Sequence, residues 1–183
     1  MMKPVDHSLP MFIKAVAFAA RKHRQQRRKD AEASPYINHP IALANVLANE
    51  GFVSDEATLC AAVLHDTVED TETTPDEIAA AFGKEVAALV MFVTDDKSLP
   101  KESRKQLQVD HSSGLPAKAK LIKLADKICN LRDVLESPPS TWSLARKQAY
   151  FDWSAQVVAG LRGTNAELEA VFDSIYARRL ELR

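Results

Sequence analysis

The amino-acid sequence predicts an all-α fold. Apolar residues recur at helical spacing, and the alternating β-branched segments typical of half-buried strands are almost absent. Glycine occurs only five times in 183 residues, so few positions interrupt a helix. A chain of this length buries a core without disulfides, and its 46% hydrophobic and 27% charged residues are ordinary for a globular protein. We therefore expect one domain over residues 1–183.

The first part of the chain carries clear helix signals. Over residues 9–20, one stripe is apolar and contains Phe12, Ile13, Val16 and Ala20. Pro40 suits the first turn of a helix that runs to Glu50, and Gly51 stands just past its end. The apolar run 59–64 predicts the buried start of a further helix.

Two short helices follow, and then a polar stretch. Thr74 to Glu77 reads as a capping box with Pro75 at the first helical position, and Gly83 ends that helix. Residues 84–93 form another helix. The polar residues 94–116 show no helical stripe and are expected to be a loop or a mobile region.

The C-terminal part of the chain predicts two long helices. Residues 117–135 carry leucines and an isoleucine at helical spacing and stop before Pro138: Leu121, Leu124, Ile128, Leu131 and Leu135. The segment 164–167 resembles a capping box that opens a last helix with four inward residues: Leu168, Val171, Phe172 and Ile175. We expect the helices within residues 141–183 to pack on the rest of the domain.

Composition excludes several functional classes. A net charge of −1 and a pI near 6.5 argue against a general nucleic-acid or membrane-surface binder. Cys60 and Cys129 lie in apolar surroundings without a CxxC partner, which favours a reducing compartment over a disulfide framework. No secretory apolar region and no run of membrane-spanning length is present. We expect a cytoplasmic protein; the sequence makes no prediction of oligomeric state.

The segment 65–71, HDTVEDT, has the composition of a functional site. His65 and Asp66 precede Glu69 and Asp70 by one helical turn, so these side chains share a face if the helix continues. Three carboxylates and one imidazole are unsuited to a core, yet they follow directly on the apolar run 59–64. The pattern indicates a divalent metal with proton chemistry beside it.

A doublet alone does not complete a metal shell, and two more residues are candidates. His39 begins a helix, where a cap or core role is the alternative to ligation. Asp126 lies in a helix whose other stripe is apolar, so it needs a partner: a bound cation, or one of the neighbours Lys123 and Lys127. Two imidazoles and two carboxylates suit Mn, Fe or Zn better than Ca or Mg.

The order of these residues, a His, then His-Asp, then a distant Asp, resembles the HD-domain metal-dependent phosphohydrolases. Five segments narrow the likeness: KHRQQRRKD, PYINHP, LHDTVEDT, VTDDK and KLADKICNLRD. Together they resemble the hydrolase domain of the RelA/SpoT-homologue family over about residues 12–150. Because no synthetase domain accompanies them, the chain is most similar to the small stand-alone alarmone hydrolases. The resemblance implies a single-domain HD-type helical bundle.

The resemblance also implies roles for individual residues. The metal ligands would be His39, His65, Asp66 and Asp126, with Mn²⁺ as the usual ion and Zn²⁺ or Fe²⁺ as alternatives. The catalytic acidic pair would be Glu69 and Asp70. The positions that match substrate contacts are Arg28, Lys29, Asn130 and Tyr150. Arg146, one turn before Tyr150, is a plausible further phosphate contact. The basic run 21–29 holds six Lys or Arg in nine positions and suits a phosphate-rich substrate, although such a run can also be a solvated turn.

The implied reaction is removal of pyrophosphate from the 3′ position of ppGpp or pppGpp, which gives GDP or GTP. An HD-type phosphohydrolase acting on another nucleotide or on a cofactor such as NADPH would use the same metal set. A non-catalytic alarmone-binding sensor would show a missing ligand or a missing acidic pair. Because this chain has both, a hydrolase is favoured over a sensor or a pure interaction module.

Overall fold

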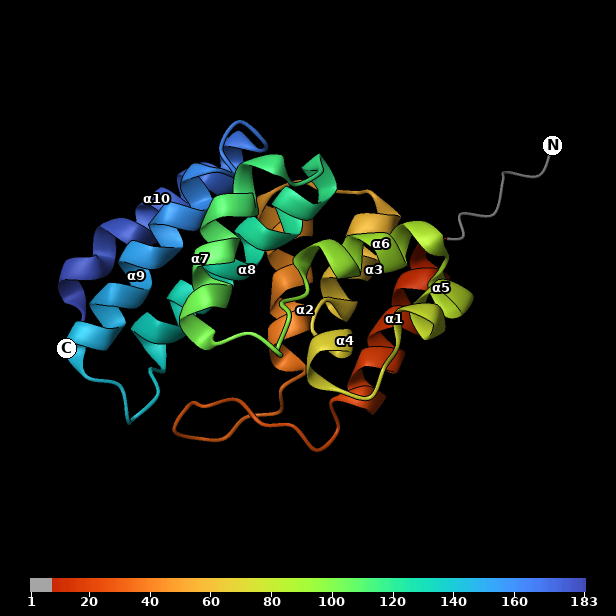
Figure 1. The fold of residues 1–183 in the computed structure, drawn as a ribbon, viewed down its shortest axis with the longest axis horizontal. Helices are drawn as coiled ribbons and strands as arrows, with labels where there is room; N and C mark the ends of the chain where they lie inside the picture. The colour runs from red at the N-terminus through yellow and green to blue at the C-terminus, as the bar shows by residue number, and fades with distance from the viewer. Residues whose placement is uncertain (1–7) are drawn as a thin grey trace.

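The predicted helices form a single bundle in the computed structural model, which describes residues 8–183 (Figure 1). The first six helices are α1 (Ser8–Lys22), α2 (Asn38–Asn45), α3 (Glu56–Leu64), α4 (Thr67–Asp70), α5 (Pro75–Phe82) and α6 (Lys84–Val93). They are followed by α7 (Lys101–His111), α8 (Ala117–Glu136), α9 (Leu144–Ala159) and α10 (Ala166–Ala177). Within the described residues there is no β-strand beyond one isolated bridge between Arg27 and Pro35. The all-α prediction is confirmed. No helix between residues 8 and 183 is long and apolar enough to span a bilayer.

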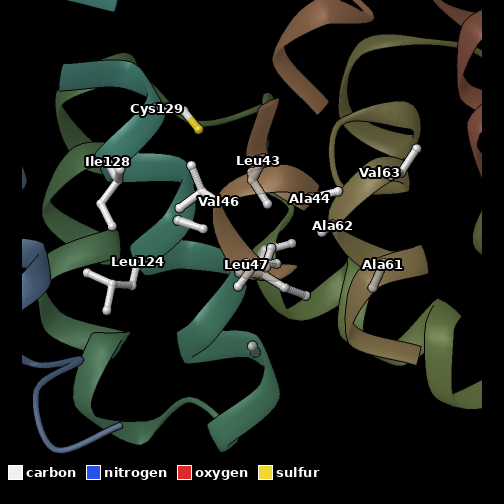
Figure 2. Packing of buried hydrophobic residues seen from close by; sticks show 14 of the residues in the cluster. Leu43, Ala44, Val46, Leu47, Ala61, Ala62, Val63, Leu124, Ile128 and Cys129 are labelled. Atoms are coloured by element: carbon white, nitrogen blue, oxygen red, sulfur yellow. The ribbon is translucent and has the colours of Figure 1, made fainter. Parts of the chain in front are cut away.

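The core is built where α2 lies between α3 and α8. Figure 2 shows Leu43 and Leu47 between the alanines of α3 and the aliphatic side chains of α8. The run from Ala61 to Leu64 is fully buried, as is Leu124 of α8. Burial of each such leucine stabilises the fold by about 1.5–3 kcal/mol. The alanines of α3 have short side chains, which lets α1, α2 and α6 approach it closely.

The predicted helix from Pro40 to Glu50 changes its winding midway. After α2, residues Val46–Glu50 form a π-helical turn, and Gly51 closes it with its N–H bonded to the Val46 carbonyl at 2.9 Å. Gly51 has an ordinary negative φ of −93°. A Cβ there would lie 2.8 Å from the side chain of Leu168, so the glycine permits the close approach of α10.

The expectation of a loop or mobile region over residues 94–116 was wrong. Residues 94–116 are not a continuous loop, because α7 occupies Lys101–His111 and a 3-10 turn follows. The sequence of this helix has no strong apolar stripe, and accordingly none of its residues is fully buried. Its packing on α9 depends on a long-range bond, from the indole Nε1 of Trp153 to the Lys105 carbonyl at 3.0 Å.

The cap of the last helix also differs from the prediction. The N-cap residue is Asn165, whose side chain accepts the Leu168 N–H at 2.9 Å, so the helix begins one residue later than the Thr164 box implies. The carboxylate of Glu169, rather than that of Glu167, bonds the preceding backbone N–H groups, including that of Asn165 at 3.2 Å. The capping box at Thr74 is present in part, since Thr74 accepts the Glu77 N–H.

Candidate metal centre and active site

Three of the four predicted metal ligands converge at the centre of the bundle. The ligand atoms of His39, His65 and Asp126 all lie within 4.8 Å of one another. His39 lies in α2, Asp126 lies in α8, and His65 directly follows the end of α3; these three helices also form the core. Both imidazoles are 5% exposed, so the core packing fixes their positions.

Asp66, the fourth predicted ligand, lies beside this group. Its Oδ2 is 3.0 Å from Nε2 of His65 and accepts a hydrogen bond from the Tyr36 hydroxyl. Helix α3 ends at Leu64, and the chain turns through His65 and Asp66 before α4 begins at Thr67. The helix therefore does not continue from His65 to Asp70, and the turn places the Asp66 carboxylate beside the imidazole of His65.

The polar atoms of this group fit a divalent cation. Nδ1 of His65 donates to the Ala62 carbonyl at 2.8 Å, which leaves Nε2 facing the centre. That nitrogen is buried without a hydrogen-bond partner, although the Asp66 carboxylate is adjacent. Nε2 of His39 lies 3.3 Å from Oδ1 of Asp126. The two imidazole nitrogens and the Asp126 carboxylate that converge, with the Asp66 carboxylate beside them, form a mixed donor set suited to a divalent transition metal.

The same charges govern the ionisation of the ligands. Burial opposes charging of His65, but the carboxylates of Asp66 and Asp126 outweigh it and raise the pKa of His65 to about 9. Burial also opposes ionisation of Asp66, yet the imidazoles of His65 and His39 hold its pKa well below the usual range. Burial opposes ionisation of Asp126 as well, but the Lys127 ammonium and the His39 imidazole hold its pKa well below the usual range, so both carboxylates stay ionised.

Of the partners that the sequence offered Asp126, the structure shows the neighbouring lysine Lys127. Its Oδ2 is 3.0 Å from Nζ of Lys127, while its Oδ1 faces His39 and accepts the Asn130 amide at 2.6 Å. Lys123 turns away and donates to the Val93 carbonyl at 3.0 Å. One oxygen is thus occupied by a lysine, and the other is directed at the metal group.

The predicted catalytic pair divides between two spaces. Glu69 lines the central cavity with the metal group, and its Oε2 accepts the Asp95 N–H at 3.0 Å. Burial, reinforced by the charges of Asp66, Asp95 and Asp70, raises the pKa of Glu69. Asp70 lines an adjoining cavity instead, where it accepts the Gln26 amide at 2.8 Å and the Lys97 ammonium. The two neighbouring carboxylates therefore have different surroundings.

The five predicted substrate residues line a cleft of three adjoining cavities. The central cavity has a volume of about 200 Å³, and the others about 430 and 650 Å³. Tyr150 lines all three, Arg28 and Asn130 line the first two, Lys29 lines the two larger ones, and Arg146 lines the largest. Residues far apart in the sequence thus form one continuous surface beside the metal group.

Comparison with known proteins identifies the family of this fold. The family model of the HD domain matches residues 15–150. The chain belongs to the HD-domain family. It is 54% identical to the Xenopus tropicalis protein named guanosine-3′,5′-bis(diphosphate) 3′-pyrophosphohydrolase MESH1, over 91% of this chain and 93% of that protein. The Homo sapiens protein of the same name is also 54% identical, with the same coverage of 91% and 93%.

A solved structure gives the same relationship in three dimensions. It is described as a metazoan ortholog of SpoT that hydrolyses ppGpp, and it superposes with a TM-score of 0.90 at 45% identity. The match covers 98% of each chain. The predicted likeness to small stand-alone HD-domain hydrolases is confirmed, and an HD-domain hydrolase with this His and Asp group implies a divalent metal.

Several residues of this HD-domain site were not predicted. Tyr36 supports Asp66, and its place three residues before His39 in the PYINHP segment was the available signal. The aromatic wall of the cleft was also missed: the Tyr150 ring lies 5.3 Å from both Trp142 and Trp153. The Lys127 ammonium stands 4.4 Å from the centre of the Trp153 ring. No local pattern marks these tryptophans as site residues.

Proposed function

We propose that this HD-domain protein hydrolyses ppGpp and pppGpp at the 3′ position, releasing pyrophosphate and leaving GDP or GTP. The observation that carries the proposal is the juxtaposition of a buried His and Asp donor group, an acidic pair beside it and a cleft lined by cations. The relatives that share more than nine-tenths of the chain are named for this reaction, which supports the assignment.

His39, His65, Asp66 and Asp126 are the proposed ligands of one divalent ion, with Mn²⁺ the ion we propose. When bound, this ion supplies Lewis-acid catalysis to the displacement at phosphorus. The Tyr36 hydroxyl, the Lys127 ammonium and the Ala62 carbonyl orient the donor atoms from behind. This outer set keeps the carboxylates aligned before the substrate arrives.

Glu69 is the proposed proton-transfer group of the acidic pair. It faces the central cavity, and its raised pKa brings its titration closer to neutral pH, where a carboxyl group both accepts and releases a proton. Asp70 is held by Gln26 and Lys97 on the side away from the metal group, so its proposed role is to orient water or substrate. The two carboxylates act as a unit with separate tasks.

The cleft accounts for a substrate with two diphosphate groups. Arg28 lines the first two cavities and forms an ion pair with Asp133. We propose that its guanidinium exchanges this carboxylate for a phosphate group when the substrate binds. Lys29 and Arg146 provide further positive charge around the largest cavity. We assign nucleotide contacts to Asn130 and Tyr150, which stand between the metal group and these cations.

A product assay tests the proposal. Purified protein with Mn²⁺ is incubated with ppGpp, pppGpp, NADPH and dNTPs, and pyrophosphate and phosphate are measured separately. We expect one pyrophosphate per ppGpp, loss of turnover with chelator, and loss of both metal binding and turnover in D66A. The variant E69A/D70A should keep the metal and lose turnover. Persistence of ppGpp in the presence of Mn²⁺ would overturn the assignment, and phosphate release from NADPH alone would replace it with a cofactor phosphatase.

A further inference from the structure

The segment VTDDK, residues 93–97, holds none of the proposed metal ligands or substrate contacts, yet it contacts both carboxylates of the acidic pair. It leaves the end of α6 in extended conformation and runs beside α4 before α7 begins (Figure 1). The backbone N–H of Asp95 bonds Oε2 of Glu69 at 3.0 Å. Two residues later, the Lys97 ammonium bonds Oδ1 of Asp70 and lies 3.9 Å from Oε1 of Glu69.

We infer that Asp95 and Lys97 are positioning residues that keep Glu69 and Asp70 in separate orientations. The inference rests on the proposed function, in which this pair performs the proton chemistry. Helix α4 spans only Thr67–Asp70, so this single turn does not by itself restrict the two acidic side chains at its end. The segment from α6 supplies one donor to each carboxylate and thereby sets which of them faces the metal group.

Asp95 is itself held firmly enough to serve this purpose. Its Oδ2 accepts the Gln108 side-chain amide from α7 at 2.6 Å. Its Oδ1 lies 3.8 Å from Nζ of Lys123, a buried lysine of α8 that also bonds the Val93 carbonyl at 3.0 Å. The side chain of Asp95 therefore anchors its own backbone N–H against α7 and α8. The only hydrogen bond from Asp95 to Glu69 is made by that N–H group, while the Asp95 carboxylate also acts on Glu69 through its charge.

Lys97 has a different relation to the pair. Gln26 bonds Oδ2 of Asp70 from the α1–α2 side, and Lys97 bonds Oδ1 from the α6–α7 side. The Asp70 carboxylate is thus held between two donors from opposite loops. Asp96, which lies between Asp95 and Lys97, is exposed, and its side chain bonds only Ser98 of its own turn, so it provides a matched control on the same segment.

The test is a set of double-mutant cycles measured with ppGpp and Mn²⁺. We expect D95A to lower kcat about 10- to 100-fold, because displacement of a catalytic group by about 1 Å has an effect of that size. KM and the Mn²⁺ affinity should not change. D95N, which keeps an acceptor for Gln108, should recover most of kcat, and D96A should match the wild type. K97M should lower kcat about 10-fold, and K97R should restore most of it.

The decisive outcome is coupling within each pair. D95A should cause no further loss in an E69Q background, and K97M none in a D70N background. Independent, multiplying effects, or a rise in KM with kcat unchanged, would show direct substrate contact and overturn the inference. If D95A does not fold by circular dichroism, Q108M removes the same anchor and replaces it in the cycle. If E69Q and D70N retain full kcat, the proposed acidic pair fails instead, which is a separate result.

Discussion

Replacement of Tyr36 by phenylalanine should weaken metal binding without disturbing the fold. The Tyr36 hydroxyl donates to Oδ2 of Asp66, a carboxylate whose pKa lies well below its usual range. The ring itself packs against His23 at 4.9 Å and His39 at 6.1 Å, and phenylalanine keeps these contacts. Only the support of one proposed ligand is lost.

The magnitude follows from the charge of the acceptor. A hydrogen bond to a charged group contributes about 1.5–3 kcal/mol, which corresponds to about a 10- to 100-fold change in an equilibrium constant. Loss of an outer partner of a metal ligand typically lowers metal affinity by about the same 10- to 100-fold. The two estimates agree, so we expect the Mn²⁺ dissociation constant of Y36F to rise by that factor.

Isothermal titration of the metal-free protein with Mn²⁺ measures this constant, and thermal unfolding of the metal-free protein checks that the fold is retained. Y150F is the matched control, since Tyr150 lines the same cavity and belongs to the proposed nucleotide contacts. It should raise KM for ppGpp and leave Mn²⁺ affinity unchanged. A Y36F protein that binds Mn²⁺ as tightly as the wild type would refute the outer-shell role of this hydroxyl.

Three further predictions concern pH and packing. Because the pKa of Glu69 is raised above 4.5, kcat should increase with pH through that raised value as the carboxylate ionises, and E69Q should lose this limb of the pH–rate profile. The Arg132 guanidinium bonds Glu50 through two 2.7 Å contacts and lowers its pKa, so the stability it contributes is present above pH 4.5 and is lost as pH falls through the lower folded value. E50Q should reduce the free energy of unfolding at pH 7 by about 0.5–1 kcal/mol, measured by urea titration, and flatten its acid dependence; an unchanged acid limb would exclude this pair as its source. G51A should lower the free energy of unfolding by about 1–3 kcal/mol, because the new methyl group would overlap with the Leu168 side chain. An unchanged melting temperature would contradict this prediction and show that α10 can shift away without loss of stability.

The sequence was sufficient for elements with a continuous apolar stripe or a capping signal. The helices around Leu124 and Pro75 appear where predicted, because burial and capping are encoded within a few residues. Helix α7 has neither signal, since its position depends on the Trp153 indole and on the seating of Ser112 against Gly160. Such contacts exist only after distant segments have packed.

The same limit applies to the site. His39, His65 and Asp126 were predicted because each lies in a short motif, and the core helices then bring them together. Gln26 and Lys97, the residues that hold Asp70, lie 44 and 27 positions away from it in the sequence. No spacing rule connects residues so far apart. A single sequence therefore identifies the groups that perform the chemistry more readily than the groups that orient them.

The division between Glu69 and Asp70 follows from helix geometry and the break after Leu64. Consecutive residues on a helix point about 100° apart, so the side chains of Glu69 and Asp70 leave α4 in different directions. The turn at His65 and Asp66 starts α4 in a new direction, which directs Glu69 toward the metal group and Asp70 toward the α1–α2 loop. Had α3 continued without a break, His65 and Glu69 would share one face of a single helix, and Asp66 would not turn inward. The interruption of the helix thus separates His65 and Asp66, two of the proposed metal ligands, from Glu69 and Asp70, the proposed proton-transfer pair.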